Sequence, residues 1–167
     1  MENDEELKSK FSNMFIMLLY SIMTNDLEKV KHFLTPNLID KYTKVINENM
    51  SKNETVMYDE LNVKTITITN KEEKDGYNYV YVDLISRYMN YVLDGNGNFL
   101  RGNNKRRDEI PHKLVFKKKL GASNNLVNKC PGCGANIDAN FSGKCEYCGM
   151  VYSAEDYDYQ LESITNL

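Results

Sequence analysis

Four cysteines lie in two pairs near the C-terminal end of the sequence, and together they could hold a metal ion. The pairs read Cys130-Pro-Gly-Cys133-Gly and Cys145-Glu-Tyr-Cys148-Gly, and the sequence holds no other cysteine. In a CxxC turn the two intervening residues bring both sulfurs to one side of the backbone. Zinc prefers four ligands in a tetrahedron, and four thiolates leave no position open for water. The spacing therefore predicts one structural zinc ion per chain in a small zinc ribbon.

Two disulfides, a redox-active CxxC pair and a rubredoxin-like iron centre are the alternatives for these cysteines. Disulfides need an oxidising compartment, and no secretory signal is visible in the sequence. A redox pair is typically single and begins a helix after a strand. Zinc is therefore the preferred interpretation. Gly134 and Gly149 follow the second cysteine of each pair, where a positive φ would let the chain fold back over its sulfur.

The overall charge and the apolar segments indicate which partners to expect. The net charge is -3, so the field of the whole chain does not favour nucleic acid or an anionic membrane. Clustered reduced cysteines fit a reducing compartment, and we expect a cytoplasmic protein. The most apolar segment, residues 11–23, is shorter than the roughly 20 residues that a bilayer requires. We expect no transmembrane segment, while peripheral membrane contact stays open.

Helical periodicity dominates the first third of the sequence. Apolar residues recur at three-and-four spacing over residues 7–23, which predicts a buried helical face. Asn25 and Glu28 have the spacing of a capping box, which predicts a short second helix. Thr35 and Pro36 then have the residue types of an N-cap and a first helical position, and they predict a third helix to about residue 49.

The periodicity changes to two in the middle of the sequence. Residues 61–69 alternate and are rich in β-branched side chains, with a phase slip that predicts a bulge or a bend near residues 64–65. Residues 77–93 predict one very long strand, or two strands joined at a bend. A polar loop is expected over residues 94–108, and another strand over residues 110–120.

Helices followed by long antiparallel strands indicate an α+β fold. We expect N-terminal helices packed on a curved antiparallel sheet that forms a cone with an open mouth. The sequence divides into a helix-and-sheet domain at residues 1–122, the four-cysteine zinc ribbon at residues 126–152, and residues 153–167, which return to the main domain.

Three runs in the C-terminal half carry a family resemblance. These are HKLVFKKK at residues 112–119, CPGCGANIDANFSGKCEYCG at residues 130–149, and YDYQLESI at residues 157–164. Together they resemble bacterial proteins of the Tim44-like family, over residues 61–167 and by layout only in the helices. The resemblance implies a cystatin-like or nuclear-transport-factor-2-like cone joined to a zinc ribbon. The ligands that it implies are Cys130, Cys133, Cys145 and Cys148.

Further candidate site residues lie in the strands. Tyr77, Tyr79 and Tyr81 form a stripe on one side of a strand, and such a stripe can line a pocket or an interface. Asp83 lies on the same side, and alternation places His112 on the inward side of the next predicted strand. Either could perform acid–base chemistry in a cone. A local ion pair for Asp83 and a hydrogen-bonded strand histidine are preferred, because no motif ties the two residues together.

The basic residues of the predicted loop and last strand form a local cluster over residues 101–119. Asp108 and Glu109 interrupt it, whereas binding to phosphates requires several cations along one track. We therefore expect no nucleic-acid partner.

The expected function is a non-catalytic, zinc-containing interaction or scaffold module that binds a protein, a peptide or its own copy. A small-molecule-binding or acid–base enzyme cone is the alternative. A cone filled by the helix at residues 11–23 would favour the module. An apolar pocket with Asp83 or His112 at its base would favour the enzyme.

Overall fold

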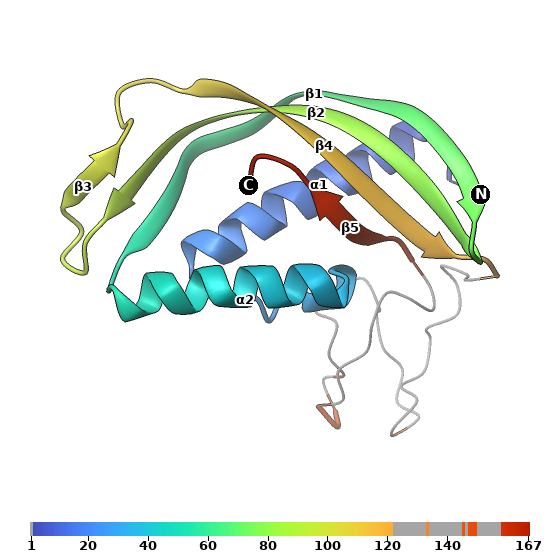
Figure 1. The fold of residues 1–167 in the computed structure, drawn as a ribbon, viewed down its shortest axis with the longest axis horizontal. Helices are drawn as coiled ribbons and strands as arrows, with labels where there is room; N and C mark the ends of the chain where they lie inside the picture. The colour runs from blue at the N-terminus through green and yellow to red at the C-terminus, as the bar shows by residue number, and fades with distance from the viewer. Residues whose placement is uncertain (1, 122–132, 134–144, 146, 150–157) are drawn as a thin grey trace.

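A computed structural model of the chain describes residues 2–121, 133, 145, 147–149 and 158–167. The predicted α+β fold is confirmed, because two N-terminal helices pack on a curved, five-stranded antiparallel sheet (Figure 1). The helical elements are α1 (Asp4–Met23), η1 (Lys31–Phe33) and α2 (Pro36–Ser51). The strands are β1 (Thr55–Lys74), β2 (Tyr77–Leu93), β3 (Phe99–Gly102), β4 (Asp108–Lys119) and β5 (Gln160–Ile164).

The sheet has the order β1-β2-β4-β5, and the short β3 pairs with β2 beside β4. All paired neighbours are antiparallel. Figure 1 shows the long strands arching over the two helices. None of the described helices combines the length and the apolar character needed to cross a lipid bilayer.

Helix α1 has Asn3 as its N-cap and Thr24 as its C-cap. At its start Asn3 Oδ1 accepts the Glu6 backbone N–H at 2.9 Å, and the Glu6 carboxylate accepts the Asn3 N–H at 3.0 Å. This capping box satisfies two donors that a helix start leaves without partners. After the helix, Asn25 has a φ of +55°, so the predicted capping box at Asn25 is wrong. A turn and the short 3₁₀-helix η1 replace the predicted second α-helix.

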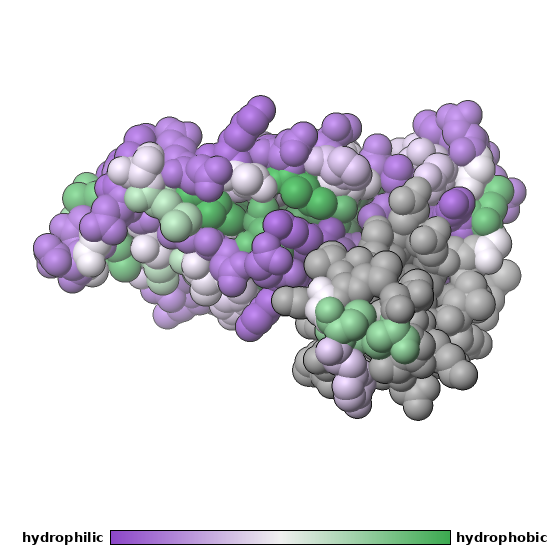
Figure 2. All heavy atoms as spheres, turned by 90° about the horizontal axis from the view of Figure 1, so that it is seen from below, coloured by the Kyte–Doolittle hydropathy of each residue, from purple (hydrophilic) through white to green (hydrophobic). Residues whose placement is uncertain are grey.

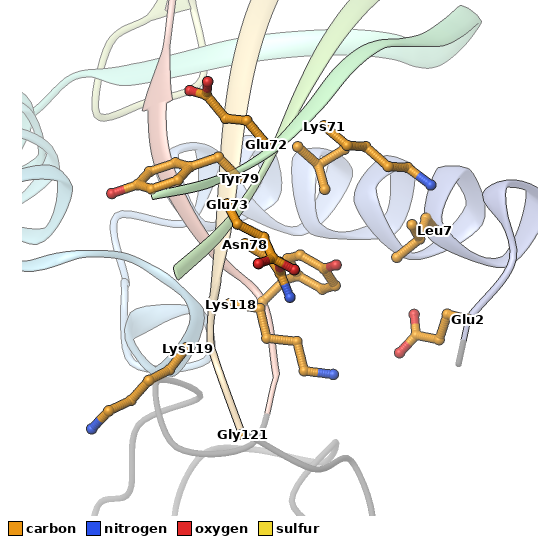
Figure 3. Close-up of a pocket in the computed structure, with 12 residues that line it drawn as sticks. Glu2, Leu7, Lys71, Glu72, Glu73, Asn78, Tyr79, Lys118, Lys119 and Gly121 are labelled. Atoms are coloured by element: carbon orange, nitrogen blue, oxygen red, sulfur yellow. The ribbon is translucent and has the colours of Figure 1, made fainter. Parts of the chain in front are cut away.

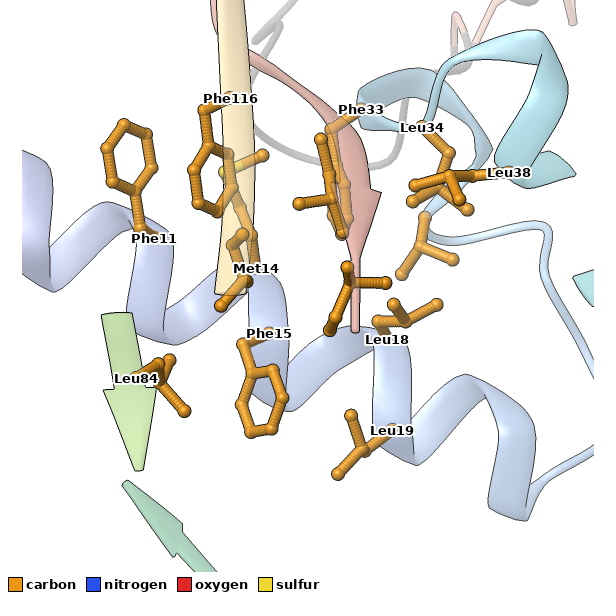
Figure 4. Close-up of a cluster of buried hydrophobic side chains, with 14 of the residues drawn as sticks. Phe11, Met14, Phe15, Leu18, Leu19, Phe33, Leu34, Leu38, Leu84 and Phe116 are labelled. Carbon is orange, nitrogen blue, oxygen red and sulfur yellow. The ribbon is translucent and has the colours of Figure 1, made fainter. Parts of the chain in front are cut away.

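The concave side of the sheet is filled by α1. Phe11, Phe15, Leu18 and Leu19 are completely buried. The Phe11 ring stacks on Phe116 of β4 with ring centroids 3.8 Å apart, as Figure 4 shows. Seen from the helical side, hydrophobic residues gather in a strip framed by hydrophilic ones (Figure 2). The hydrophobic core therefore lies between α1, α2 and the sheet.

The strands match the predicted pattern in their centres and differ at their ends. β2 is one continuous strand, and the register shift between Val63 and Thr65 confirms the bulge predicted in β1. β1 extends beyond the predicted residues 61–69 as far as Lys74, because the turn that follows it is confined to Asp75 and Gly76. Both residues have positive φ, as a tight two-residue hairpin requires.

Strand β3 lies inside the segment that the sequence predicts to be a polar loop, so that expectation is wrong for Phe99–Gly102. β3 pairs with the end of β2, from Tyr91↔Gly102 to Leu93↔Phe99. Gly102 has a φ of +109° and packs so closely that an added Cβ would lie 2.5 Å from the Asn90 carbonyl oxygen. The pairing thus depends on a glycine at this position.

Strand β5 fills the far edge of the sheet. Leu161 is completely buried, and its carbonyl oxygen accepts the Thr35 N–H at 3.1 Å. An isolated bridge joins Leu161 to Leu34. The residues from 160 onward therefore pack on the main domain, while most of residues 126–152 lie outside the described part of the chain.

Candidate metal centre and predicted pocket residues

Three of the four predicted ligands lie together. The Sγ atoms of Cys133, Cys145 and Cys148 are all within 4.8 Å of one another. The Cys145 side chain is buried, whereas Cys133 and Cys148 are exposed. Cys130 lies outside the described residues. Cys133 precedes Cys145 by twelve residues, so a single CxxC turn does not account for the proximity of all three sulfurs.

The distance between two of the sulfurs excludes a disulfide between them. Cys133 Sγ and Cys145 Sγ are 3.8 Å apart, whereas disulfide-bonded sulfurs are about 2.05 Å apart. Around a tetrahedral ion with Zn–S bonds of about 2.3 Å, neighbouring sulfurs lie about 3.8 Å apart. The spacing of these two sulfurs therefore fits a shared thiolate-bound ion.

The backbone around the second pair has the predicted turn. The Gly149 N–H donates to the Cys145 carbonyl oxygen at 3.0 Å, and Gly149 has a φ of +77°. The predicted positive φ at Gly149 is confirmed, while Gly134 lies outside the described residues. Tyr147, between the two cysteines, is 73% exposed. This turn holds Cys145 and Cys148 toward the same point and leaves Tyr147 in solvent.

The tyrosine stripe lies on the outer face of the sheet. Tyr77, Tyr79 and Tyr81 are half-buried, and they alternate with the buried Val80 and Val82 that face the core. The rings of Tyr77 and Tyr79 are 6.2 Å apart. The Tyr81 hydroxyl donates a hydrogen bond to the carboxylate of Glu72 in the neighbouring strand β1. The stripe is thus a surface feature of β2 and lies away from the concave side.

Asp83 and His112 lie on opposite faces of the sheet. Asp83 pairs in register with Lys113, and Lys113 Nζ lies 3.3 Å from the Asp83 carboxylate on the exposed face. His112 is 2% exposed and faces the core, where its ring lies 4.9 Å from that of Phe15. The fold does not bring these two candidate residues together.

His112 is held by hydrogen bonds on both ring nitrogens. Nδ1 lies 2.8 Å from the Thr165 carbonyl oxygen, and Nε2 lies 2.8 Å from Ser86 Oγ. A carbonyl can only accept, so Nδ1 carries the proton and Nε2 accepts from the Ser86 hydroxyl. Burial lowers the pKa of His112, although the bond to Thr165 opposes this. The neutral ring therefore fits the site.

Acidification is expected to destabilise the fold through its histidines. The pKa of His112 is lowered in the folded chain, and burial also lowers the pKa of His32. The unfolded chain therefore binds more protons below about pH 6.5. The histidine contribution to the free energy of unfolding is fully present above that pH. It is lost as the pH falls toward the pKa values of the folded chain. Each histidine adds a slope of at most about 1.4 kcal/mol per pH unit.

Urea unfolding between pH 8 and pH 5 measures this slope. His112→Gln removes one titrating group. The free energy of unfolding of this variant should therefore fall less steeply on acidification than that of the wild type. His32→Gln serves as the matched variant. Equal slopes for all three proteins would contradict the prediction.

A pocket of about 470 Å³ lies at the end of the sheet next to the N-terminal end of α1 (Figure 3). Leu7, Val80 and Tyr159 contribute apolar surface, and most other lining residues are charged or polar. Of the five predicted pocket or interface residues, Tyr79 lines it. Beside it Lys10 Nζ lies 2.6 Å from Glu2 and 2.8 Å from Asp158.

The ion pairs of Lys10 were missed by sequence analysis. Burial acts to lower the pKa of Lys10, but hydrogen bonds to Asp158 and Glu2 outweigh it and raise the pKa. Lys10 and Asp158 are far apart in the sequence, and no local pattern marks such a pair.

Comparison with known proteins supplies a family. The sequence model described as the Tim44-like domain matches residues 3–126. The match covers both helices and the strands through β4, and it ends before the two cysteine pairs. No curated protein matches the sequence.

Proposed function

The chain belongs to the Tim44-like domain family, and on this premise we propose that it is a non-catalytic protein-interaction or scaffold module with a structural zinc centre. Membership of the family favours protein partners. The helix-and-sheet domain would be a nuclear-transport-factor-2-like cone, and the cysteine segment would be a zinc ribbon attached to it.

The filled concave side is the observation that carries this proposal. A cone enzyme requires a cavity that admits substrate to an acid or a base. Here the aromatic side chains of α1 occupy that space, and His112 is buried beneath Phe15. Asp83 lies on the other face with Lys113. These positions support an interaction module over acid–base chemistry inside the cone.

The zinc assignment rests on the ligands that the chain offers. Three clustered thiolates favour zinc or iron among the common metals, and Cys130 would supply the fourth. Four protein thiolates give a closed, structural site. Because thiolate ligands must stay reduced, we place the protein in a reducing compartment, the cytoplasm.

Elemental analysis tests the metal directly. Protein purified without added metal is expected to contain one zinc per chain. A variant with all four cysteines replaced by serine should contain none, and it also serves as the control in a pull-down from the native cell. Substoichiometric zinc or a dominant iron content would contradict the assignment.

A further inference from the structure

One long edge of the sheet has no neighbouring strand among the described residues. The sheet path ends at β1 on one side, while β5 on the other side is bridged to Leu34 and bonded to Thr35. An unpaired strand edge offers a row of N–H and C=O groups to another chain. β1 has twenty residues, so this edge is the longest strand edge in the described fold.

The centre of β1 reads the same in both directions. Residues 65–69 are Thr-Ile-Thr-Ile-Thr, and no charged residue lies between Lys64 and Lys71. The threonines are exposed and the isoleucines are half-buried. Residues 65–68 pair regularly with β2 between two register shifts, and Thr69 is the extra residue at the second shift. Residues 65–68 are therefore the part of this uncharged stretch that keeps regular strand pairing, and their outer side has no strand neighbour among the described residues.

We propose that the β1 edges of two copies of this chain pair antiparallel about a two-fold axis at Thr67. In this register Thr67 faces Thr67 of the copy, and Ile66 faces Ile68 of the copy. Cross-strand pairs of β-branched side chains stabilise antiparallel sheets, whereas like charges directly opposite each other destabilise them. The palindromic stretch of residues 65–69 provides such β-branched pairs and places no like charges opposite each other. A two-fold axis uses the same surface on both copies, so the assembly closes as a dimer.

Helix α1 places apolar side chains beside the same edge. The Met23 sulfur accepts the Tyr58 N–H of β1 at 3.2 Å, so this side of α1 faces β1. Ile16 and Tyr20 precede Met23 by seven and three residues and thus lie on that side of the helix. Tyr20 is 53% exposed. A sheet that continues past β1 would bury part of this apolar surface.

The dimer rests on the proposed function only in that it names a second copy as the protein partner. Its formation requires no metal. The paired stretch is short, and a small interface of this kind is expected to dissociate on dilution.

A cysteine at the axis tests the pairing and its register. Directly opposed Cα atoms in an antiparallel pair lie about 4.5–5.5 Å apart, within the range of a disulfide. Thr67→Cys therefore places two thiols face to face, whereas Thr65→Cys faces Thr69 of the copy. Both variants carry the same native cysteines. With oxidised glutathione as the oxidant, we expect at least about tenfold more disulfide-linked dimer from Thr67→Cys on a non-reducing gel.

Thr67→Lys provides the complementary measurement, because it sets two lysines against each other at the axis. Sedimentation is expected to show a monomer at concentrations where the wild type is a dimer. Equal crosslinking of the two cysteine variants, a monomeric wild type at its highest soluble concentration, or a dimer that survives Thr67→Lys would overturn the proposal. Zinc is measured on every variant. A normal zinc content without dimer formation rejects the pairing alone and leaves the proposed function standing.

Discussion

Replacing Cys145 with serine is expected to abolish metal binding and unfold the cysteine segment while leaving the helices folded. Cys145 is the buried member of the cluster, 3.8 Å from Cys133. Structural zinc sites contribute about 10–16 kcal/mol of apparent binding free energy, which is also folding free energy. Loss of one thiolate should lower zinc affinity by at least about 100-fold, since changes to groups outside the ligand set already cost 10–100-fold.

Limited proteolysis and zinc analysis measure this effect. New cleavage is expected within residues 126–152, with an unchanged helical signal in circular dichroism. Tyr147→Ala is the matched control, because Tyr147 lies in the same turn, is exposed and is no ligand. A serine variant with unchanged protease resistance and full zinc content would show that Cys145 does not bind the metal.

Phe11→Ala is expected to lower the free energy of unfolding by about 3–5 kcal/mol, the usual cost of removing a buried aromatic ring. Phe11 is completely buried, stacks on Phe116 and meets the edge of the Tyr159 ring at 5.3 Å. The variant leaves a cavity between α1, β4 and the residue that leads into β5. Loss of the Phe11 ring therefore weakens the packing of all three elements.

Urea unfolding compares this variant with Asn13→Ala, which changes an exposed position of the same helix. The control should stay within about 0.5 kcal/mol of the wild type. A loss below about 1 kcal/mol for Phe11→Ala would mean that α1 does not fill the sheet as described.

Local patterns in the sequence were enough to predict the centres of the helices and strands. The spacing of Phe11, Phe15 and Leu18 predicts the face of α1 that is buried, and alternation predicts β2 at its full length. The failures lie where the backbone departs from its usual regions or where pairing is distant. Asn25 has a positive φ that a capping-box pattern does not reveal. β3 forms because Gly102 permits close approach to β2, which is a tertiary requirement.

The candidate site was predictable to the same extent. The CxxC spacing predicted that Cys145 and Cys148 lie together, because such a turn is local, and the two pairs together predicted that Cys133 joins them. The surroundings of Asp83 and His112 could not be predicted, because they depend on strand register and on Thr165, which lies 53 residues after His112. Alternation predicted that His112 faces inward, but only the packed helix shows that Phe15 covers it.

The position of β5 also has a consequence for biosynthesis. β4 leaves the ribosome well before β5, because residues 120–159 are translated between them. Until then one side of β4, together with the place of the buried Leu161 next to Leu34, remains uncovered in the nascent chain. Chains are synthesised at about 5–20 residues per second, so β5 is made several seconds after β4. During that interval the growing polypeptide is most exposed to chaperones and to aggregation.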